Sequence, residues 1–462
     1  MQIGRKDVVW NFAATIMRVA SGILLLPLAL HILTNKEYGL WTIYVTIGGL
    51  ATLLDFGFVN SFARNITYIF SGVKELKPEG YNAVSEGDIT IDYGLLKSVI
   101  LAMKRYYGIM AVVFLIVFSI VSPFYLTSLL KDYGGNKTEI WISWFAYGVL
   151  VAYQLFTYYY NSLLTGRGQV KRVQQIIIIG QTCRISTAII LLLLGYGIIS
   201  LVVAQFVSDI VNRMLCYNSF YNKEIKFNLQ TSAKVKVSEV MKIMTPNALK
   251  IGFMTMGGLL NSRMIVLISS LYLPLDTIGV YGSTMQMLVL ITSLGGLWFG
   301  TYYPKITLHR VKDDIVQIKR MYLKAKFSMV MVFIVCGAGL IFVGPDLITL
   351  IRSNTKLLPS MMIFILLIVT FLETNHNLAA QMLLTKNEVP FAKASIISGL
   401  ASVGLLYLFL RFTSIGIWGM IIAPGIAQIF YQNWKWPYMV IKDLNIKFKD
   451  YFTSAFTTIK QL

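Results

Sequence analysis

Long apolar stretches separated by short polar segments run along almost the whole chain. Twelve of them are long enough to cross a bilayer, which takes about 20 mostly apolar residues per helix. Each should be an α-helix, because an open sheet cannot satisfy its backbone hydrogen bonds in lipid. The pattern therefore predicts an all-α polytopic membrane protein. Its expected spans are 8–33, 38–64, 98–121, 140–163, 173–194, 198–216, 246–271, 277–303, 326–343, 358–384, 391–410 and 415–440.

The polar connections between the spans predict that both chain ends are cytoplasmic. With this orientation, 30 of the 41 Lys and Arg residues lie on the cytoplasmic side and only six in the external connections, which are short. That bias is the positive-inside rule. Among the longer cytoplasmic segments, 65–97 is expected to be a soluble excursion. Segments 217–245 and 304–325 are expected to be amphipathic helices on the anionic inner leaflet, or else plain solvated linkers.

Composition narrows the class further. The chain has 462 residues and a mean hydropathy of +0.66, and only 13% of its residues are charged. A soluble domain carries about twice that share of charge. The net charge of +20 lies mostly on one side of the predicted membrane, so it favours topology over nucleic-acid binding. Three dispersed cysteines and three dispersed histidines predict no metal site.

Helices one and two resemble helices seven and eight at an offset of 243 residues. Tyr38–Gly39 recurs as Tyr281–Gly282, and Phe56–Gly57 recurs as Phe299–Gly300. Both copies run from outside to inside, so the repeat is parallel. Two such six-helix halves around a central site are typical of alternating-access transporters.

The repeat predicts a division of the chain into four parts. We expect an N-terminal six-helix lobe at 1–216, a cytoplasmic amphipathic linker at 217–245, a C-terminal six-helix lobe at 246–440 and a cytoplasmic tail at 441–462.

Among the ionisable residues within or at the ends of the predicted spans, eight are candidates for functional or structural roles. Such groups cost a few kcal/mol to insert and usually face a cavity or a partner. Bases outnumber acids, so a cavity built from them would be cationic and would suit an anion. The bases are Arg18, Arg64, Arg184, Lys250 and Arg263, and the acids are Asp55, Asp209 and Glu373.

Two arginines lie deep in their spans. Arg18 is about 15 Å into the first span, and Arg263 is about 25 Å from the inner end of the seventh. A guanidinium binds phosphate oxygens in pairs, so Arg18 is expected to face the cavity and bind a substrate phosphate. The alternative is a salt bridge from Arg18 to Asp55 or Glu373. Arg263 and Lys250 would extend the phosphate site as a ladder, or would snorkel to the interfaces.

The stretch LLDFGFVNSFAR lies in the second predicted span. On a continuous helix, Asp55 and Arg64 would lie on opposite faces about 13 Å apart, so Asp55 is expected to pair with another helix, through Arg18 first. Arg64 would reach the inner headgroup layer or the mouth of the cavity. Gly57, with its counterpart Gly300, predicts a bend or a close helix contact, and so a hinge where a lobe flexes.

The fifth and sixth spans place Arg184 and Asp209 at similar depths, where we expect a structural pair. Asp209 can also pair with Arg213, one turn beyond it.

The tenth span carries a polar stripe that consists of Glu373, His376, Asn377 and Gln381. Three of these residues recur at a spacing of four, which places them on one helix face. Together with Asp55 of the second span, the stripe would line a polar cavity that hydrogen-bonds sugars, or take part in coupling to a cation bound at Glu373. The equal alternative is a seam of hydrogen bonds between helices.

Four stretches resemble the polysaccharide transporter family of the MOP superfamily: GILLLPLALHILTNKEYGLW, LLDFGFVNSFAR, YYPKITLHRVKDD and QMLLTKNEVPF. The likeness covers nearly the whole chain and is strongest to O-antigen or capsule repeat-unit translocases (Wzx-type). It implies a MOP/MATE-like fold in which two six-helix lobes form a V around a central cavity. Helix seven of such proteins often carries an acid where this chain has Arg263, which argues against an acid-dependent ion site there.

The resemblance implies a flippase of the bacterial inner membrane. It would move undecaprenyl-diphosphate-linked oligosaccharide repeat units, as in lipopolysaccharide O-antigen or capsule synthesis, from the inner to the outer leaflet by alternating access. Expected partners are the lipid-linked oligosaccharide, the bilayer and other polysaccharide-assembly membrane proteins, but no nucleic acid. We expect no cofactor, metal or catalytic residue. No Walker motif is present in the sequence, so Na⁺, H⁺ or the substrate gradient would drive transport.

Two other classes remain as alternatives. A multidrug or cation antiporter of the same superfamily should line its cavity with carboxylates, whereas here the bases outnumber the acids. An enzyme such as an O-antigen polymerase or ligase should place a sizeable loop outside, whereas the predicted external connections are short.

Overall fold

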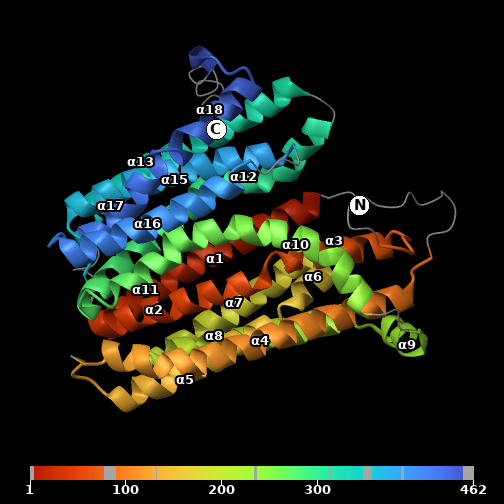
Figure 1. Cartoon of the computed structure of the whole chain (residues 1–462), viewed down its shortest axis with the longest axis horizontal. Coiled ribbons are helices and arrows are strands. Elements are labelled where there is room, and N and C mark those ends of the chain that lie inside the picture. Colours follow the sequence, from red (N-terminus) through yellow and green to blue (C-terminus); the bar gives the residue numbers. More distant parts are fainter. Residues whose placement is uncertain are drawn as a thin grey trace. The chain divides into compact units, whose positions relative to one another are not determined.

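Every regular element of the described chain is a helix. The computed structural model describes residues 5–76, 90–131, 133–233, 237–311, 314–346, 356–386 and 390–450. Figure 1 shows the helices in colours that follow the sequence. The first are α1 (Arg5–Ile32), α2 (Asn35–Ala51), the 3₁₀ turn η1 (Thr52–Asp55), α3 (Phe58–Phe70), α4 (Tyr93–Leu129), α5 (Lys137–Phe156), α6 (Tyr159–Gly166), α7 (Val170–Leu193), α8 (Ile199–Phe220) and α9 (Lys223–Thr231). The others are α10 (Val237–Leu259), the π-turn η2 (Leu260–Met264), α11 (Ile265–Ser269), α12 (Leu275–Val311), α13 (Ile315–Phe342), α15 (Ser360–Leu384), α16 (Ala392–Phe412), α17 (Trp418–Ile429) and α18 (Gln432–Asp443).

Nine helical stretches within the described residues are long and apolar enough to cross a membrane. Of the other three predicted spans, the second is broken into α2 and α3 and the twelfth into α17 and α18. The seventh is one helical stretch in which the π-turn η2 joins α10 to α11. The fourth predicted span, 140–163, is also broken, between α5 and α6. The all-α class is therefore confirmed, whereas the second, fourth and twelfth spans are not the continuous helices that were expected.

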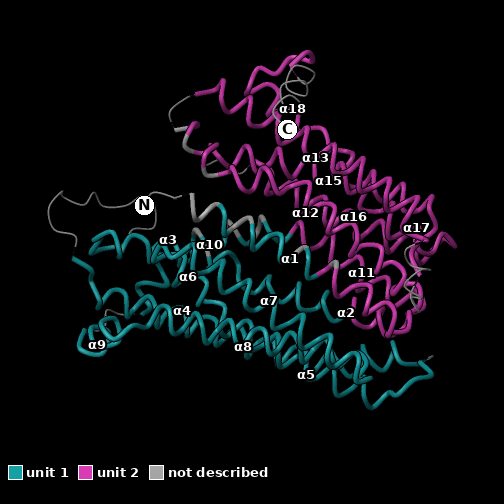
Figure 2. Tube along the Cα trace, turned by 180° about the vertical axis from the view of Figure 1, so that it is seen from behind, with its two compact units in different colours: residues 1–21, 44–256 teal, residues 22–43, 257–462 magenta. Residues whose placement is uncertain are grey.

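The chain forms two compact units, which Figure 2 shows in separate colours. Unit 1 comprises 1–21 and 44–256, and unit 2 comprises 22–43 and 257–462. Within unit 1, α7 packs along α8, α3 along α6, and α4 along α5. Within unit 2, α12 packs along α13, α16 along α17, and α15 along α18.

These units differ from the predicted lobes at the beginning of the chain. Residues 22–43, which join the end of α1 to the beginning of α2, belong to unit 2. The predicted lobe boundaries at 216 and 246 stay predictions, and residues 451–462 of the predicted tail lie outside the described part.

Within unit 2, α2 and α12 approach each other backbone to backbone. A Cβ atom on Gly39 would collide with the carbonyl oxygen of Leu275 and would lie 3.1 Å from the nitrogen of Gly279. A Cβ atom on Gly282 of α12 would in turn meet the side chain of Thr42 on α2. Only glycine permits so close an approach. Gly39 and Gly282 are the glycines of the two Tyr-Gly copies, so this part of the repeat builds a helix crossing.

Two predicted amphipathic segments turn out to belong to longer helices. Segment 304–325 is the end of α12 and the beginning of α13, and not a separate surface helix. The Asp314 side chain caps α13 by accepting a hydrogen bond from the Gln317 amide at 3.2 Å. Segment 217–245 contains α9 and the first turns of α10, so Pro246 lies inside α10 and does not begin it. Helical periodicity continued past the predicted span ends, so parts of both segments extend neighbouring helices, while α9 is a short helix of its own. The expected place of these segments on the inner leaflet stays a prediction.

Ion pairs join the helix ends at the predicted cytoplasmic side of unit 2. Arg310 of α12 contacts Asp443 of α18 at 2.9 Å, and Lys386, just past α15, pairs with the same carboxylate. Lys319 of α13 contacts Asp450 at 2.6 Å, and its hydrogen bond to that carboxylate lowers the pKa of Asp450. The C-terminal segment is thus tied to three other helices of its unit.

Candidate functional site

The second membrane crossing is broken within unit 1. After η1, Phe56 (φ 44°) and Gly57 (φ 75°) both adopt the left-handed backbone region, and α3 begins at the next residue. Glycine reaches this region freely, whereas for Phe56 it costs about 1–2 kcal/mol. On α10, a Cβ atom at Gly252 would lie 2.8 Å from the Phe56 Cα, so a glycine there makes room for the break. The chain does turn at Gly57, and its role as a hinge stays a prediction.

Asp55 spans this break and caps α3. Its carboxylate accepts hydrogen bonds from the Gly57 amide at 3.1 Å and from the Val59 amide at 3.0 Å. From α4, the Tyr107 hydroxyl donates to the same carboxylate at 2.5 Å. A negative group suits this position, because the beginning of a helix carries partial positive charge.

The expected pairing of Asp55 with Arg18 is not found. Among the side chains that the structure describes, Asp55 is held by neutral donors only. The break is the reason, since it turns the carboxylate back onto the beginning of α3. For the same reason, Asp55 and Arg64 no longer share one continuous helix, and the opposite-face geometry derived for them was wrong.

Two arginines of unit 1 remain exposed. Arg18 lies on α1 and Arg64 on α3, and both side chains are open to their surroundings. Among the described side chains, neither guanidinium has a hydrogen bond or an ion pair. Five N–H donors on each are thus available to an external acceptor.

Arg184 and Asp209 belong to a chain of hydrogen bonds inside unit 1. The Asp209 carboxylate accepts from the Gln154 amide at 2.6 Å and from the Gln205 amide at 3.2 Å. Arg184 donates to the Gln205 carbonyl oxygen at 3.3 Å. The predicted direct pair was wrong, because Gln205, which both donates and accepts, stands between the two charges.

The seventh crossing contains a π-turn that includes Arg263. Asn261 in the turn is buried and accepts a hydrogen bond from the Ser402 hydroxyl of α16, and Arg263 is half-buried. Single π-turns are frequent at functional sites. Lys250 lies earlier, on α10, and its side chain lies outside the described part, so the predicted ladder of Arg263 and Lys250 stays a prediction.

On α15, two of the predicted polar residues form hydrogen bonds to neighbouring helices. Glu373 accepts a hydrogen bond from Gln428 of α17, and His376 Nδ1 lies 2.7 Å from the Asn433 amide oxygen of α18. Both contacts belong to a seam between helices, which was the structural alternative. An ion-coupling role of Glu373 and His376 stays a prediction.

Three further predicted site residues, two on α15 and one on α12, lack the contacts that were expected of them. Asn377 and Gln381 are exposed on the surface of unit 2. Gly300 lies inside the uninterrupted helix α12, and nothing within 4 Å would meet a Cβ atom there. Gly300 therefore makes neither a helix break nor a close helix contact.

Sequence reasoning missed Lys326 on α13. Its side chain is only 8% exposed, and the ammonium lies 5.6 Å from the ring centre of Tyr322, one turn earlier. Among the described residues, no acid pairs with it. The segment had been interpreted as a surface helix that ended at residue 325, which placed this lysine at the membrane boundary. The Tyr322–Lys326 spacing of four was the available signal.

No protein-family model and no curated protein matches the chain. Solved structures of transporters share its fold. An inward-facing multidrug resistance MATE family transporter of the MOP superfamily matches with a TM-score of 0.63 and 16% identity over 96% of each chain. The lipid II flippase MurJ in an inward closed conformation matches with a TM-score of 0.65 and 13% identity, over 98% of this chain and 90% of that one. The chain therefore has the fold of MOP superfamily transporters, which are multi-pass membrane proteins.

Proposed function

We propose that this chain, with its MOP transporter fold, flips polyprenyl-diphosphate-linked oligosaccharides from the inner to the outer leaflet of a bacterial cytoplasmic membrane. The oligosaccharide would be an O-antigen or capsule repeat unit. One of the two fold matches reported above is described as a lipid II flippase. We extend a lipid-linked substrate to this chain as part of the proposal, together with the V-shaped arrangement of two lobes around a central cavity.

The charges inside the spans are the observation that carries the proposal. Asp55 accepts hydrogen bonds from neutral groups in a helix cap, and Glu373 accepts one from Gln428 in a helix seam. Arg18 and Arg64 are exposed. Exposed cations with satisfied acids favour an anionic substrate, whereas a cation antiporter should leave its carboxylates open to ligands.

In the proposed mechanism, exposed guanidiniums bind the diphosphate while the polyprenyl tail stays in lipid. An arginine fork binds two phosphate oxygens at once, which fixes the headgroup as well as attracting it. Arg18 and Arg64 would act first, and Arg263 and Lys250 would extend the site. Alternating access then moves the headgroup across the membrane.

We propose that a gradient of Na⁺ or H⁺ drives transport. The cation would bind at Glu373, His376, Asn377 and Gln381. Glu373 and His376 already face polar neighbours, and Asn377 and Gln381 offer exposed amide oxygens. Transport by reconstituted protein should then respond to an imposed Na⁺ or pH difference, and Glu373→Gln should remove that response.

Depletion of the protein in cells tests the proposal. Polyprenyl-diphosphate oligosaccharide should accumulate on the inner leaflet while surface glycan falls. Unchanged levels of the lipid-linked oligosaccharide and of the surface glycan would rule out the proposed flippase activity. Arg18→Ala should reduce flipping about tenfold or more, since one charge-assisted phosphate contact is lost. Arg411→Ala, at an exposed arginine near the end of α16, is the matched control and should leave flipping unchanged.

A further inference from the structure

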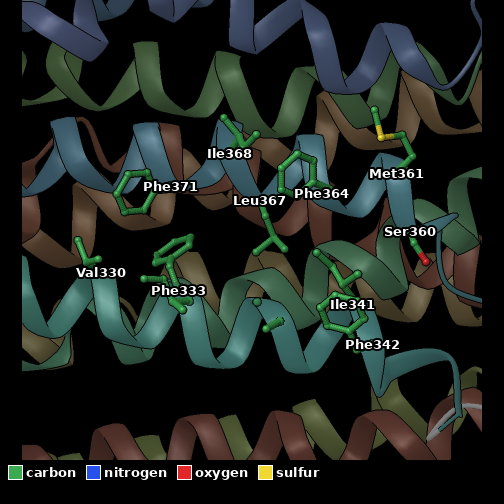
Figure 3. Close-up of a pocket in the computed structure, with 13 residues that line it drawn as sticks. Val330, Phe333, Ile341, Phe342, Ser360, Met361, Phe364, Leu367, Ile368 and Phe371 are labelled. Carbon is green, nitrogen blue, oxygen red and sulfur yellow. The ribbon is translucent and has the colours of Figure 1, made fainter.

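An apolar groove of about 710 Å³ lies between α13 and α15 in unit 2. Figure 3 shows Phe333 of α13 and Leu367 of α15 pointing toward each other across it, with Phe371 at one end. Ser360 is the only lining residue with a hydroxyl, and none carries a charge. Its volume is within the range of sites that hold small ligands, about 300–1,000 Å³.

The groove opens toward hydrocarbon. Both helices are candidate membrane spans, and lining side chains such as Phe342 (76% exposed) and Met361 (62% exposed) are open to their surroundings. Small residues, Gly337 and Ala338, keep the space between the helices open. Along α13 the groove extends from Val330 to Phe342, about 18 Å, which is close to the depth of one leaflet.

A buried lysine precedes this groove along α13 and is not among the residues that line it. Lys326 precedes Val330 by one turn and shares a helix face with Phe333, seven positions on. Its contact is with the ring of Tyr322 on the same helix, and among the described side chains no acid pairs with it. A buried ammonium is stable only with a counter-charge or strong acceptors. Along α13 in chain direction, Lys326 therefore comes first and the apolar groove follows.

We propose that Lys326 and the α13–α15 groove form a loading site for the lipid-linked substrate. Lys326 binds the diphosphate, and the groove holds the first part of the polyprenyl tail. This rests on the proposed function. With the predicted topology, Lys326 lies on the inner side of the groove, so the bound lipid has the orientation of the inner leaflet. One groove between two helices takes one chain, which favours a polyprenyl lipid over a phospholipid with two acyl chains.

Binding to the full chain in phosphatidylcholine nanodiscs tests the site. The probes are radiolabelled undecaprenyl diphosphate and undecaprenol, which has the same tail without the charge. Lys326→Met should weaken diphosphate binding about thirtyfold and leave undecaprenol binding unchanged, because only the charge contact is removed. Lys326→Arg should retain most of the affinity for the diphosphate. Arg320→Met, at an exposed cation of the same helix, is the control and should bind as the wild type.

Filling the groove gives the second half of the test. Ala338 is exposed, so Ala338→Trp should fold, fill the groove and weaken both probes about tenfold. Val335→Trp, on the same helix but outside the groove, should change neither. Elution as a single species from a sizing column checks folding, and Ile334→Trp replaces Ala338→Trp where that variant fails it.

Three outcomes would overturn the inference. They are unchanged diphosphate binding in Lys326→Met, unchanged binding of both probes in the groove-filling variants, and competition by phosphatidylglycerol as strong as that by undecaprenyl diphosphate. The last would assign the groove to a bilayer phospholipid. Flipping of a sugar-bearing polyprenyl lipid is measured separately on the wild type. Absence of flipping with intact binding would reject the proposed function and leave the binding site standing.

Discussion

The two repeated dipeptides of this chain behave differently in the fold. Gly39 and Gly282, the Tyr-Gly copies, lie at one crossing of α2 and α12 and serve the same purpose there. Gly57 and Gly300, the Phe-Gly copies, do not. The helix breaks at Gly57, whereas α12 continues through Gly300 for several more turns.

The residue two positions before each glycine accounts for this difference. In the first copy it is Asp55, whose carboxylate caps the new helix and accepts from Tyr107. In the second copy it is Trp298, which has no acceptor to offer a helix end. Glycine permits a break, but the break forms only where another residue satisfies the freed backbone groups.

A substitution at the crossing of α2 and α12 should have the largest effect on stability. Gly39→Ala should lower the free energy of unfolding by about 3 kcal/mol, because its methyl group collides with the backbone of α12 at Leu275. Thermal unfolding of the detergent-solubilised protein, followed by the amount of soluble monomer, measures the effect. Wild-type stability of Gly39→Ala would show that the two helices do not need this close contact.

Removing the cap should come next in size. Asp55→Ala leaves the Tyr107 hydroxyl and two backbone amides without their acceptor, and should cost about 2 kcal/mol. Trp298→Ala, at the matching position of the second copy, removes no cap and should leave α12 continuous. Equal effects of the two variants on backbone amide exchange at the start of α3 would contradict a capping role for Asp55.

The smallest effects should have opposite signs. Gly57→Ala forces a Cβ atom into the left-handed region and should destabilise by about 1–2 kcal/mol. Gly300→Ala adds a methyl group inside a helix where there is open space, and should stabilise by about 0.5–1 kcal/mol. The same unfolding assay compares the stabilities of the two variants. If both variants were stabilised, or both destabilised, the proposed difference between the two Phe-Gly copies would be wrong.

Sequence patterns predicted the class of the fold well, because the bilayer demands long apolar helices. They did not predict the break after η1 or the π-turn η2, at both of which side chains hydrogen-bond to other helices. The partner of Asp55 shows why: Tyr107 is 52 positions away and looks apolar in a span, so no local pattern marks it. Lys326 was missed for a related reason, since its burial depends on where α13 begins and not on composition.

The candidate site was predicted only as an inventory of charges. Arg18 and Arg64 were correctly singled out as unusual, yet their exposure came from the fold. Glu373 and His376 were equally consistent with a cavity and a seam, because a spacing of four marks a helix face without naming what that face meets. Partners on α17 and α18 show that both residues take part in a seam, and an ion-coupling role for them stays a prediction.

The continuity of α12 beyond the predicted membrane has a mechanical consequence. At 37 residues the helix is about 56 Å long, whereas the hydrocarbon layer is about 30 Å thick. A rigid rod of this kind acts as a lever, so any change of its tilt in the bilayer is largest at its far end. A spectroscopic label near His309 would therefore move farther when α12 changes its tilt than a label placed anywhere within the bilayer.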